Sequence, residues 1–285
     1  MDKLLILPFD HRSSFIKDIA KTDDPAIVRG LKGLIFKAFL QTWEKSQDKN
    51  SLAVLIDDQY GTDIIRQAKE KGINFTVALE KSGSEIFEFE HGDDFGTSLE
   101  EINPTYAKVL IRYIPGNDSV NEKQLLNLEK LAEHCRNTHR RVILELLVPP
   151  SSEELEDAER YDQRIRPAKT IQAIAEISSK IIPDIWKMEG FSKENWELIF
   201  SQVPFDMKVI VLGRGEDAKK VEEWLSTAAG FENIIGFAVG RTVFSEPLSK
   251  LQRAEIDEAE AVQEISTNFE RLIELWNSKK ASFGL

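Results

Sequence analysis

Short apolar runs alternate with longer amphipathic stretches along the whole chain. Each short run is rich in Val, Ile, Leu or Phe and is bounded by turn residues or charges, as buried strands are. The runs predict eight strands, near residues 4–9, 52–57, 74–80, 107–113, 141–148, 184–189, 207–213 and 234–239. Helical spacing of apolar residues predicts helices near 27–45, 61–71, 121–137, 167–180, 192–202, 217–228 and 256–278. The connection 81–105 has the weakest helical pattern, with room for one short helix after Gly92.

Eight strand–helix units in 285 residues predict an α/β protein built as a single (β/α)8 TIM barrel over residues 1–285. A doubly wound sheet is the rival fold. It would be favoured by a glycine-rich turn after an early strand, and the sequence has none there. The acidic, polar stretch 151–166 is expected to form a long loop or short helix over the top of the barrel.

The formal net charge of −12 argues against broad binding to nucleic acid or to an anionic membrane, although a small basic pocket remains compatible with it. No apolar run approaches the roughly 18 residues of a membrane span. The first apolar run predicts a strand and not a signal peptide. Cys135 is the only cysteine, which excludes an internal disulfide. We therefore expect a cytoplasmic protein, with a homo-oligomer left open.

Charged residues interrupt the apolar runs at positions that strand alternation turns inward. Val142, Leu144 and Leu146 share one strand face and are expected to meet the helices, so Glu145 is expected to point into the barrel. The same alternation turns Lys187 inward. The other charges expected in the interior or at strand ends are Asp10, Asp57, Asp58, Glu80, Lys108, Arg112 and Glu189.

Buried charges are costly unless they are paired, so a purely structural ion-pair network is one interpretation of this set. Its clustering toward the carboxyl ends of strands, where barrel active sites lie, favours catalysis. Lys187 has apolar neighbours, and a second cation, Lys108 or Arg112, would further favour its neutral amine. A neutral lysine amine forms a Schiff base with a carbonyl. Glu145, on the adjacent strand, is the candidate proton shuttle.

Two glycine–arginine turns follow strands seven and eight, where barrels frequently bind phosphate. They are Gly213-Arg214-Gly215 and Gly240-Arg241-Thr242. Glycine lets backbone N–H groups approach phosphate oxygens, and arginine supplies a planar charged fork. The alternative is that each pair merely turns the chain. The two together predict a phosphate site at Gly213, Arg214, Gly240 and Arg241.

Histidines near strand ends raise the question of a metal. His11 and His91, with Asp57, Asp58 or Glu80, are the residues that could hold a divalent ion. No HxH or HExxH spacing supports such a site, so no metal is expected. A serine nucleophile is not expected either, because the sequence lacks a Gly-x-Ser-x-Gly elbow.

Seven runs of residues resemble one family in order along the chain: the aldolase-like domain often fused behind the 2-deoxy-5-keto-gluconate kinase of inositol catabolism, similar in turn to class I tagatose-1,6-bisphosphate aldolases. The runs are Leu7-Pro8-Phe9-Asp10-His11-Arg12, Leu79-Glu80-Lys81-Ser82-Gly83, Lys108-Val109-Leu110-Ile111-Arg112-Tyr113, Glu145-Leu146-Leu147-Val148-Pro149, Trp186-Lys187-Met188-Glu189-Gly190, Leu212-Gly213-Arg214-Gly215 and Gly236-Phe237-Ala238-Val239-Gly240-Arg241-Thr242.

The resemblance implies a metal-independent class I aldolase that needs no cofactor. Lys187 matches the Schiff-base lysine of the tagatose-bisphosphate enzymes, Glu145 their proton-transfer glutamate and Lys108 a lysine near the substrate. Their aspartate and arginine after strand one match the expected substrate-binding residues Asp10 and Arg12, and His11 replaces a glutamine. Glu80, Arg112 and Glu189 complete the expected substrate-binding set.

The same resemblance favours 2-deoxy-5-keto-gluconate 6-phosphate as the substrate, giving dihydroxyacetone phosphate and malonate semialdehyde. Leu-Gly-Arg-Gly after strand seven departs from the Ser-Ala-Gly type of turn in the bisphosphate aldolases, so tagatose bisphosphate or another ketose phosphate comes second. Two further classes stay open. One is an isomerase or epimerase that uses Glu145 and Glu80 as acid and base, and the other is a sugar-phosphate-binding module without turnover.

Overall fold

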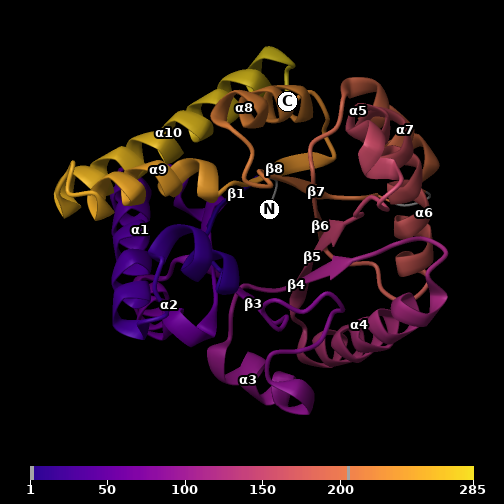
Figure 1. Cartoon of the computed structure of the whole chain (residues 1–285), viewed down its shortest axis with the longest axis horizontal. Helices are drawn as coiled ribbons and strands as arrows, with labels where there is room; N and C mark the ends of the chain where they lie inside the picture. The colour runs from indigo at the N-terminus through magenta and orange to yellow at the C-terminus, as the bar shows by residue number, and fades with distance from the viewer. Residues whose placement is uncertain (1–2, 204–205) are drawn as a thin grey trace.

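The computed structural model describes residues 3–203 and 206–285, so residues 1–2 and 204–205 of the predicted range 1–285 lie outside the described residues. Eight parallel strands pair in sequence order and close between β1 and β8 (Figure 1). The prediction of a (β/α)8 TIM barrel is confirmed. The strands are β1 (Leu4–Pro8), β2 (Leu52–Ile56), β3 (Asn74–Ala78), β4 (Tyr106–Arg112), β5 (Arg141–Leu147), β6 (Ile185–Met188), β7 (Val209–Leu212) and β8 (Ile234–Ala238).

The helices cover the outside of the barrel (Figure 1). They are α1 (Pro25–Lys45), α2 (Asp58–Lys71), α3 (Phe95–Ile102), α4 (Asp118–Thr138), α6 (Arg166–Ser178), α7 (Lys193–Gln202), α8 (Ala218–Ala228), α9 (Arg241–Gln252) and α10 (Glu258–Ser282). The short helix expected after Gly92 is α3. Helix α9 was not predicted, because Pro247 lies inside it and a proline usually indicates a helix end. Val243, Phe244 and Leu248 nevertheless bury one face of α9.

Alternation along the strands divides the core into two apolar layers, as predicted. Trp186 and Met188 of β6 join the layer between strands and helices, whereas Ile185 joins the layer inside the barrel. The interior layer lies below the charged side chains and consists of Leu4, Ile6, Ala53, Leu55, Ala78, Tyr106, Ile143, Ile185, Ile210, Ile235 and Ala238. Closure requires Gly236, because a Cβ there would lie 1.8 Å from the Leu4 carbonyl oxygen.

The stretch 151–166 forms consecutive helical turns between β5 and α6, which fits the expected long loop or short helix. These turns are η4 (Glu154–Asp157), α5 (Ala158–Arg160) and η5 (Tyr161–Ile165). Buried Tyr161 fastens them to the barrel through a hydrogen bond from its hydroxyl to the carbonyl of Val148. Among the described residues, no helix is long and apolar enough to cross a membrane.

Candidate active site

Two adjoining cavities open at the carboxyl ends of the strands. The cavity beside β3 has a volume of about 230 Å³, and the one beside β7 and β8 about 270 Å³. We call them the acidic cavity and the glycine-loop cavity. Both are lined by His11, Ser14, Leu110, Arg112, Glu145 and Lys187. The predicted lysine–glutamate pair therefore lies where the two cavities meet.

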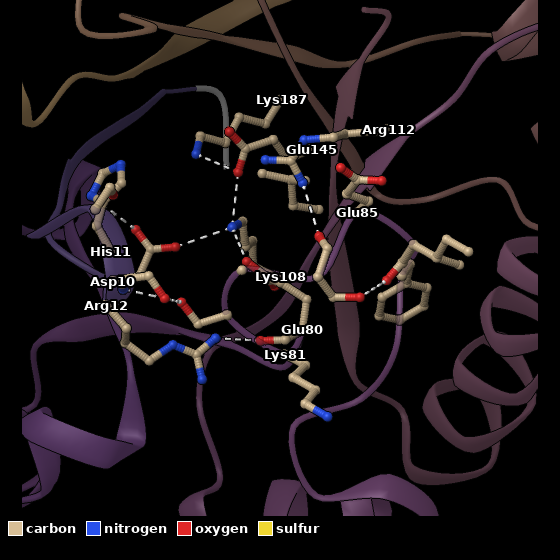
Figure 2. A pocket seen from close by; sticks show the side chains of 18 residues that line it. Asp10, His11, Arg12, Glu80, Lys81, Glu85, Lys108, Arg112, Glu145 and Lys187 are labelled. Atoms are coloured by element: carbon tan, nitrogen blue, oxygen red, sulfur yellow. Dashed lines mark hydrogen bonds and ion pairs between the residues drawn. The ribbon is translucent and has the colours of Figure 1, made fainter. Parts of the chain in front are cut away.

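Lys108 lies at the centre of the acidic cavity, surrounded by carboxylates from three strand ends (Figure 2). Its Nζ lies 3.0 Å from Asp10 Oδ2, 2.5 Å from Glu80 Oε1 and 2.8 Å from Glu145 Oε2. The Lys108 side chain is 2% exposed. Because each buried carboxylate needs a counter-charge, this one ammonium group holds all three in place.

Lys187 lies beside Glu145 because the two residues are register partners on neighbouring strands β5 and β6. The Nζ of Lys187 is 2.8 Å from Glu145 Oε2, the same oxygen that contacts Lys108 (Figure 2). Ile143 and Ile185, two positions earlier on the same strands, belong to the apolar layer beneath. The two strands thus place an amine and a carboxylate together, directly above the apolar layer inside the barrel.

The charges in the cluster shift the carboxyl pKa values in opposite directions. Burial alone would raise the pKa of Glu145, but Lys108 and Lys187 outweigh it and lower that pKa to about 2. Lys108 likewise holds the pKa of Asp10 well below its usual value. Glu80 differs, because burial, helped by the negative charges of Asp10 and Glu145, raises its pKa despite the contact with Lys108. Glu80 is therefore the carboxyl of the three that most readily holds a proton.

Lys108 keeps its charge in this environment. Burial opposes the charged form, but Asp10, Glu145 and Glu80 together raise its pKa well above the usual lysine value. Arg112, the other cation expected near Lys187, is exposed to solvent and lines both cavities beside Lys187. It is the last residue of β4, at the mouth of the barrel, and its guanidinium donates to the Ser84 carbonyl at 3.4 Å.

The loop after β1 carries three of the predicted or matched residues. Asp10 and His11 line the acidic cavity, where Asp10 reaches Lys108. The guanidinium of Arg12 is buried and already bonded, with Nη1 2.6 Å from Glu90 Oε2 and Nη2 donating to the Glu80 carbonyl. Arg12 therefore joins the loops that follow β1 and β3 and holds Glu80 over the cavity.

Asp57 and Asp58 follow β2 directly, at the strand end where the sequence places them, and they line neither cavity. Asp57 is fully buried, pairs with Lys32 of α1 and caps α2 by accepting from the Tyr60 N–H at 2.8 Å. Asp58 pairs with His91 at 2.5 Å. Lys32 was not identified from the sequence, because a lysine in an amphipathic helix normally indicates a solvated face.

Both glycine–arginine turns line the glycine-loop cavity. The predicted phosphate site requires the two turns to lie together in this way. Gly240 packs against β1, where a Cβ would lie 2.1 Å from the Pro8 carbonyl oxygen. Helix α9 begins at the next residue, Arg241, and has no side-chain cap. Its free N–H groups therefore add to the positive potential of the arginines. The sequence pattern missed this contribution, because it missed α9.

The two arginines of these turns are held differently. Arg214 Nη1 lies 2.8 Å from Glu189 Oε1, and buried Arg166 lies 3.6 Å from the other oxygen of Glu189. Arg241 donates to the Arg214 carbonyl at 2.6 Å and, among the described residues, has no carboxylate within 4.0 Å. Glu189 lines neither cavity, although the sequence placed it among the substrate-binding residues. Its carboxylate instead orients Arg214.

Among the residues that the structure describes, no group of three or more His, Cys, Asp or Glu side chains is arranged to hold a metal ion. His11 lines the cavities, whereas His91 pairs with Asp58 and lines neither of them. The histidines and acids considered as ligands of one metal ion therefore do not lie together at one site.

The fold and the site together define a (β/α)8 barrel protein with a lysine–carboxylate centre at the carboxyl ends of its strands. A family model described as "Uncharacterized protein conserved in bacteria (DUF2090)" matches residues 1–280. The chain belongs to the DUF2090 family. No curated protein matches the sequence.

Solved structures with a similar fold include aldolases. A fructose-bisphosphate aldolase from Plasmodium falciparum, in complex with TRAP and a small molecule inhibitor, is 13% identical with a TM-score of 0.68, over 96% of this chain and 90% of that one. An archaeal fructose 1,6-bisphosphate aldolase is 14% identical with a TM-score of 0.60, and the match covers 97% of this chain and 94% of that one. Cgl0159 from Corynebacterium glutamicum is 15% identical with a TM-score of 0.59, and the match covers 96% of this chain and 86% of that one. These similarities establish the shared fold.

Proposed function

We propose that this chain is a class I aldolase, in which the amine of Lys187 forms a Schiff base with the carbonyl carbon of a phosphorylated ketone. One observation carries the proposal: buried Lys187, at the end of β6, lines both cavities with its Nζ 2.8 Å from Glu145. A lysine amine attacks carbonyls, and the iminium that results is an electron sink for breaking a neighbouring C–C bond. The fold shared with fructose-bisphosphate aldolases supports the proposal.

Glu145 is in position to move the protons that this chemistry requires, because its Oε2 lies 2.8 Å from Lys187 Nζ. It accepts a proton from the Lys187 ammonium, and the free amine then adds to the carbonyl to give a carbinolamine. Glu145 returns the proton to the carbinolamine hydroxyl, which leaves as water while the C=N bond forms. Glu145, which is a carboxylate again after this step, next removes the proton of the hydroxyl on the β carbon. The bond between the α and β carbons breaks, its electron pair forms the enamine, and an aldehyde leaves.

The glycine-loop cavity supplies the complementary site for phosphate. We propose that Gly213, Arg214, Gly240 and Arg241 bind it, because both turns line this cavity beside Lys187 and Arg241 has no carboxylate counter-charge among the described residues. The substrate that fits the family resemblance is 2-deoxy-5-keto-gluconate 6-phosphate, cleaved to dihydroxyacetone phosphate and malonate semialdehyde. This reaction needs no metal, since the iminium serves as the electron sink. A cytoplasmic location remains our expectation.

Borohydride trapping tests the proposal directly. Incubation with dihydroxyacetone phosphate, reduction and peptide mapping are expected to yield one stable adduct, on Lys187. Lys187→Met should abolish both the adduct and aldehyde release, because no other amine replaces it at the end of β6. Lys193→Met is the matched control, since Lys193 is 70% exposed on α7 and should leave trapping unchanged.

The outcomes also separate the alternative functions. Isomerised product without triose phosphate or adduct would indicate acid–base chemistry by Glu145 and Glu80. Thermal stabilisation by the ligand without adduct or turnover would indicate a binding module. Either result would overturn the proposal of a Schiff-base aldolase.

A further inference from the structure

His11 lies where the two cavities meet and has an unexplained polar atom. Its ring is half-buried, and its backbone carbonyl accepts a hydrogen bond from buried Lys32 at 2.9 Å, which fixes this point of the loop. The Nδ1 atom is buried and, among the described residues, has no hydrogen-bond partner. A buried polar atom without a partner is costly, so a ligand group that bonds to Nδ1 would remove that cost.

Asp10 has a matching unpartnered atom beside it. Oδ1 of Asp10 is also buried without a hydrogen bond, whereas Oδ2 is bound to Lys108. The two free atoms, His11 Nδ1 and Asp10 Oδ1, are 3.9 Å apart, too far for a direct hydrogen bond (Figure 2). A hydroxyl group satisfies both at once, since it can accept from an N–H and donate to a carboxylate.

The charge state of the His11 ring is compatible with binding such a hydroxyl. Burial, together with the nearby cations Arg241 and Lys187, lowers the pKa of His11 to about 4 although Asp10 opposes the shift. The imidazole is therefore neutral at pH 7 and carries one N–H. Asp10, whose pKa is held well below its usual value, stays an acceptor.

We propose that His11 and Asp10 together bind one substrate hydroxyl, on the carbon next to the carbonyl that Lys187 attacks, and that His11 thereby selects ketones bearing this hydroxyl. The inference rests on the proposed function. With phosphate in the glycine-loop cavity and the carbonyl at Lys187, which lines both cavities, we expect the second substituent of the carbonyl carbon to extend toward the acidic cavity. His11 lines both cavities and lies beside that path.

Two ketones that differ only in this hydroxyl test the inference. Dihydroxyacetone phosphate carries it and hydroxyacetone phosphate does not. In borohydride trapping on Lys187, we expect the wild-type protein to be half-saturated by dihydroxyacetone phosphate at a concentration at least about tenfold lower, because a polar site rejects a ligand that leaves its groups unpaired. His11→Ala should reduce this preference to within about threefold. His11→Gln should retain part of it, because the amide N–H can still donate.

The possible results distinguish this inference from the proposed function. Equal half-saturation of the wild-type protein by the two ketones would overturn the role of His11 and leave the Schiff base established. A full wild-type preference in folded His11→Ala would also overturn it, with thermal stabilisation by inorganic phosphate confirming that the variant is folded. If neither ketone gives an adduct on Lys187, the proposed function fails and the inference fails with it. The wild-type comparison needs no variant, so poor folding of His11→Ala does not prevent the test.

Discussion

A single oxygen atom of Glu145 contacts two ammonium groups, at 2.8 Å from each. Replacement of Glu145 by Gln preserves the shape of the side chain and removes both its charge and its ability to accept a proton. We expect kcat to fall by about 10²- to 10⁴-fold, the range of a lost general acid–base group.

Single-turnover trapping should show whether Schiff-base formation on Lys187 slows in the Glu145→Gln variant by a similar factor. Glu176→Gln is a suitable control, because Glu176 bonds to Tyr113 on the outside of the barrel, away from both cavities. An unchanged trapping rate in Glu145→Gln would contradict the assigned role.

The neutral ring of His11 makes stability depend on pH. The pKa of this ring falls from 6.5 to about 4 on folding, chiefly through burial, so between these values the unfolded chain binds more protons than the folded protein. The contribution of His11 to stability is therefore fully present above pH 6.5 and is lost as the pH falls to 4. Its size stays below about 3 kcal/mol, the full value of such a shift, because the ring is partly solvated.

Urea unfolding at pH 4, 5, 6 and 7 measures this contribution. We expect His11→Gln to flatten the rise in the free energy of unfolding over this interval. An identical pH dependence in the two proteins would show that the His11 ring titrates normally in the folded state.

Strand alternation was sufficient to predict that Glu145 and Lys187 point inward, because successive side chains along a strand point to opposite faces. It could not show that Lys108 reaches Asp10 and Glu80, since those contacts depend on the shape of a closed barrel and on loop conformation. Nor could it show that the charges of Arg12 and Glu189 are already paired. Such pairs join residues far apart in the sequence.

At the scale of elements, the junction of β8 and α9 determines the shape of the glycine-loop cavity. A methyl group at residue 240 would lie 2.1 Å from the Pro8 carbonyl oxygen, so Gly240→Ala must move β1 or the start of α9. We expect at least a tenfold weaker affinity for dihydroxyacetone phosphate, because the helix N-terminus and Arg241 move with the junction.

Ligand titration followed by thermal shift measures the effect of Gly240→Ala. Gly33→Ala in α1 is the matched control: a Cβ there has no atom within 4 Å, and alanine in a helix should stabilise the protein by about 1 kcal/mol. Unchanged affinity in Gly240→Ala would show that this junction does not form the phosphate site.

Strong apolar patterns predicted every strand and most helices, within a few residues of their ends. The pattern predicted no helix at α9, a twelve-residue helix with Pro247 inside it. Burial of Phe244 and Leu248 outweighs the local signal of this proline. Propensity is a weak guide where tertiary packing decides.

At the scale of the whole molecule, α10 joins the two ends of the barrel. Phe269 of α10 packs against Phe39 of α1 and Phe237 of β8, with ring centroids 6.2 Å apart in both pairs. Phe269→Ala therefore removes packing between the first and last units, and we expect a loss of about 3–5 kcal/mol.

Denaturant unfolding should show this loss for Phe269→Ala and a change within about 0.5 kcal/mol for Phe283→Ala, because Phe283 is 55% exposed. Equal effects of the two substitutions would argue against α10 as the element that secures the closed barrel.

The Glu145 oxygen that contacts two lysines bears on the charges around the proposed intermediate. A protonated amine and an iminium carry the same positive charge. In the proposed mechanism, Lys187 would therefore present Glu145 with an equivalent partner before substrate arrives and after covalent attachment. The charges would already be in place when the proposed covalent intermediate forms, so that step would require little reorganisation. The ion pairs that stabilise the empty barrel and those that stabilise the intermediate would be the same contacts.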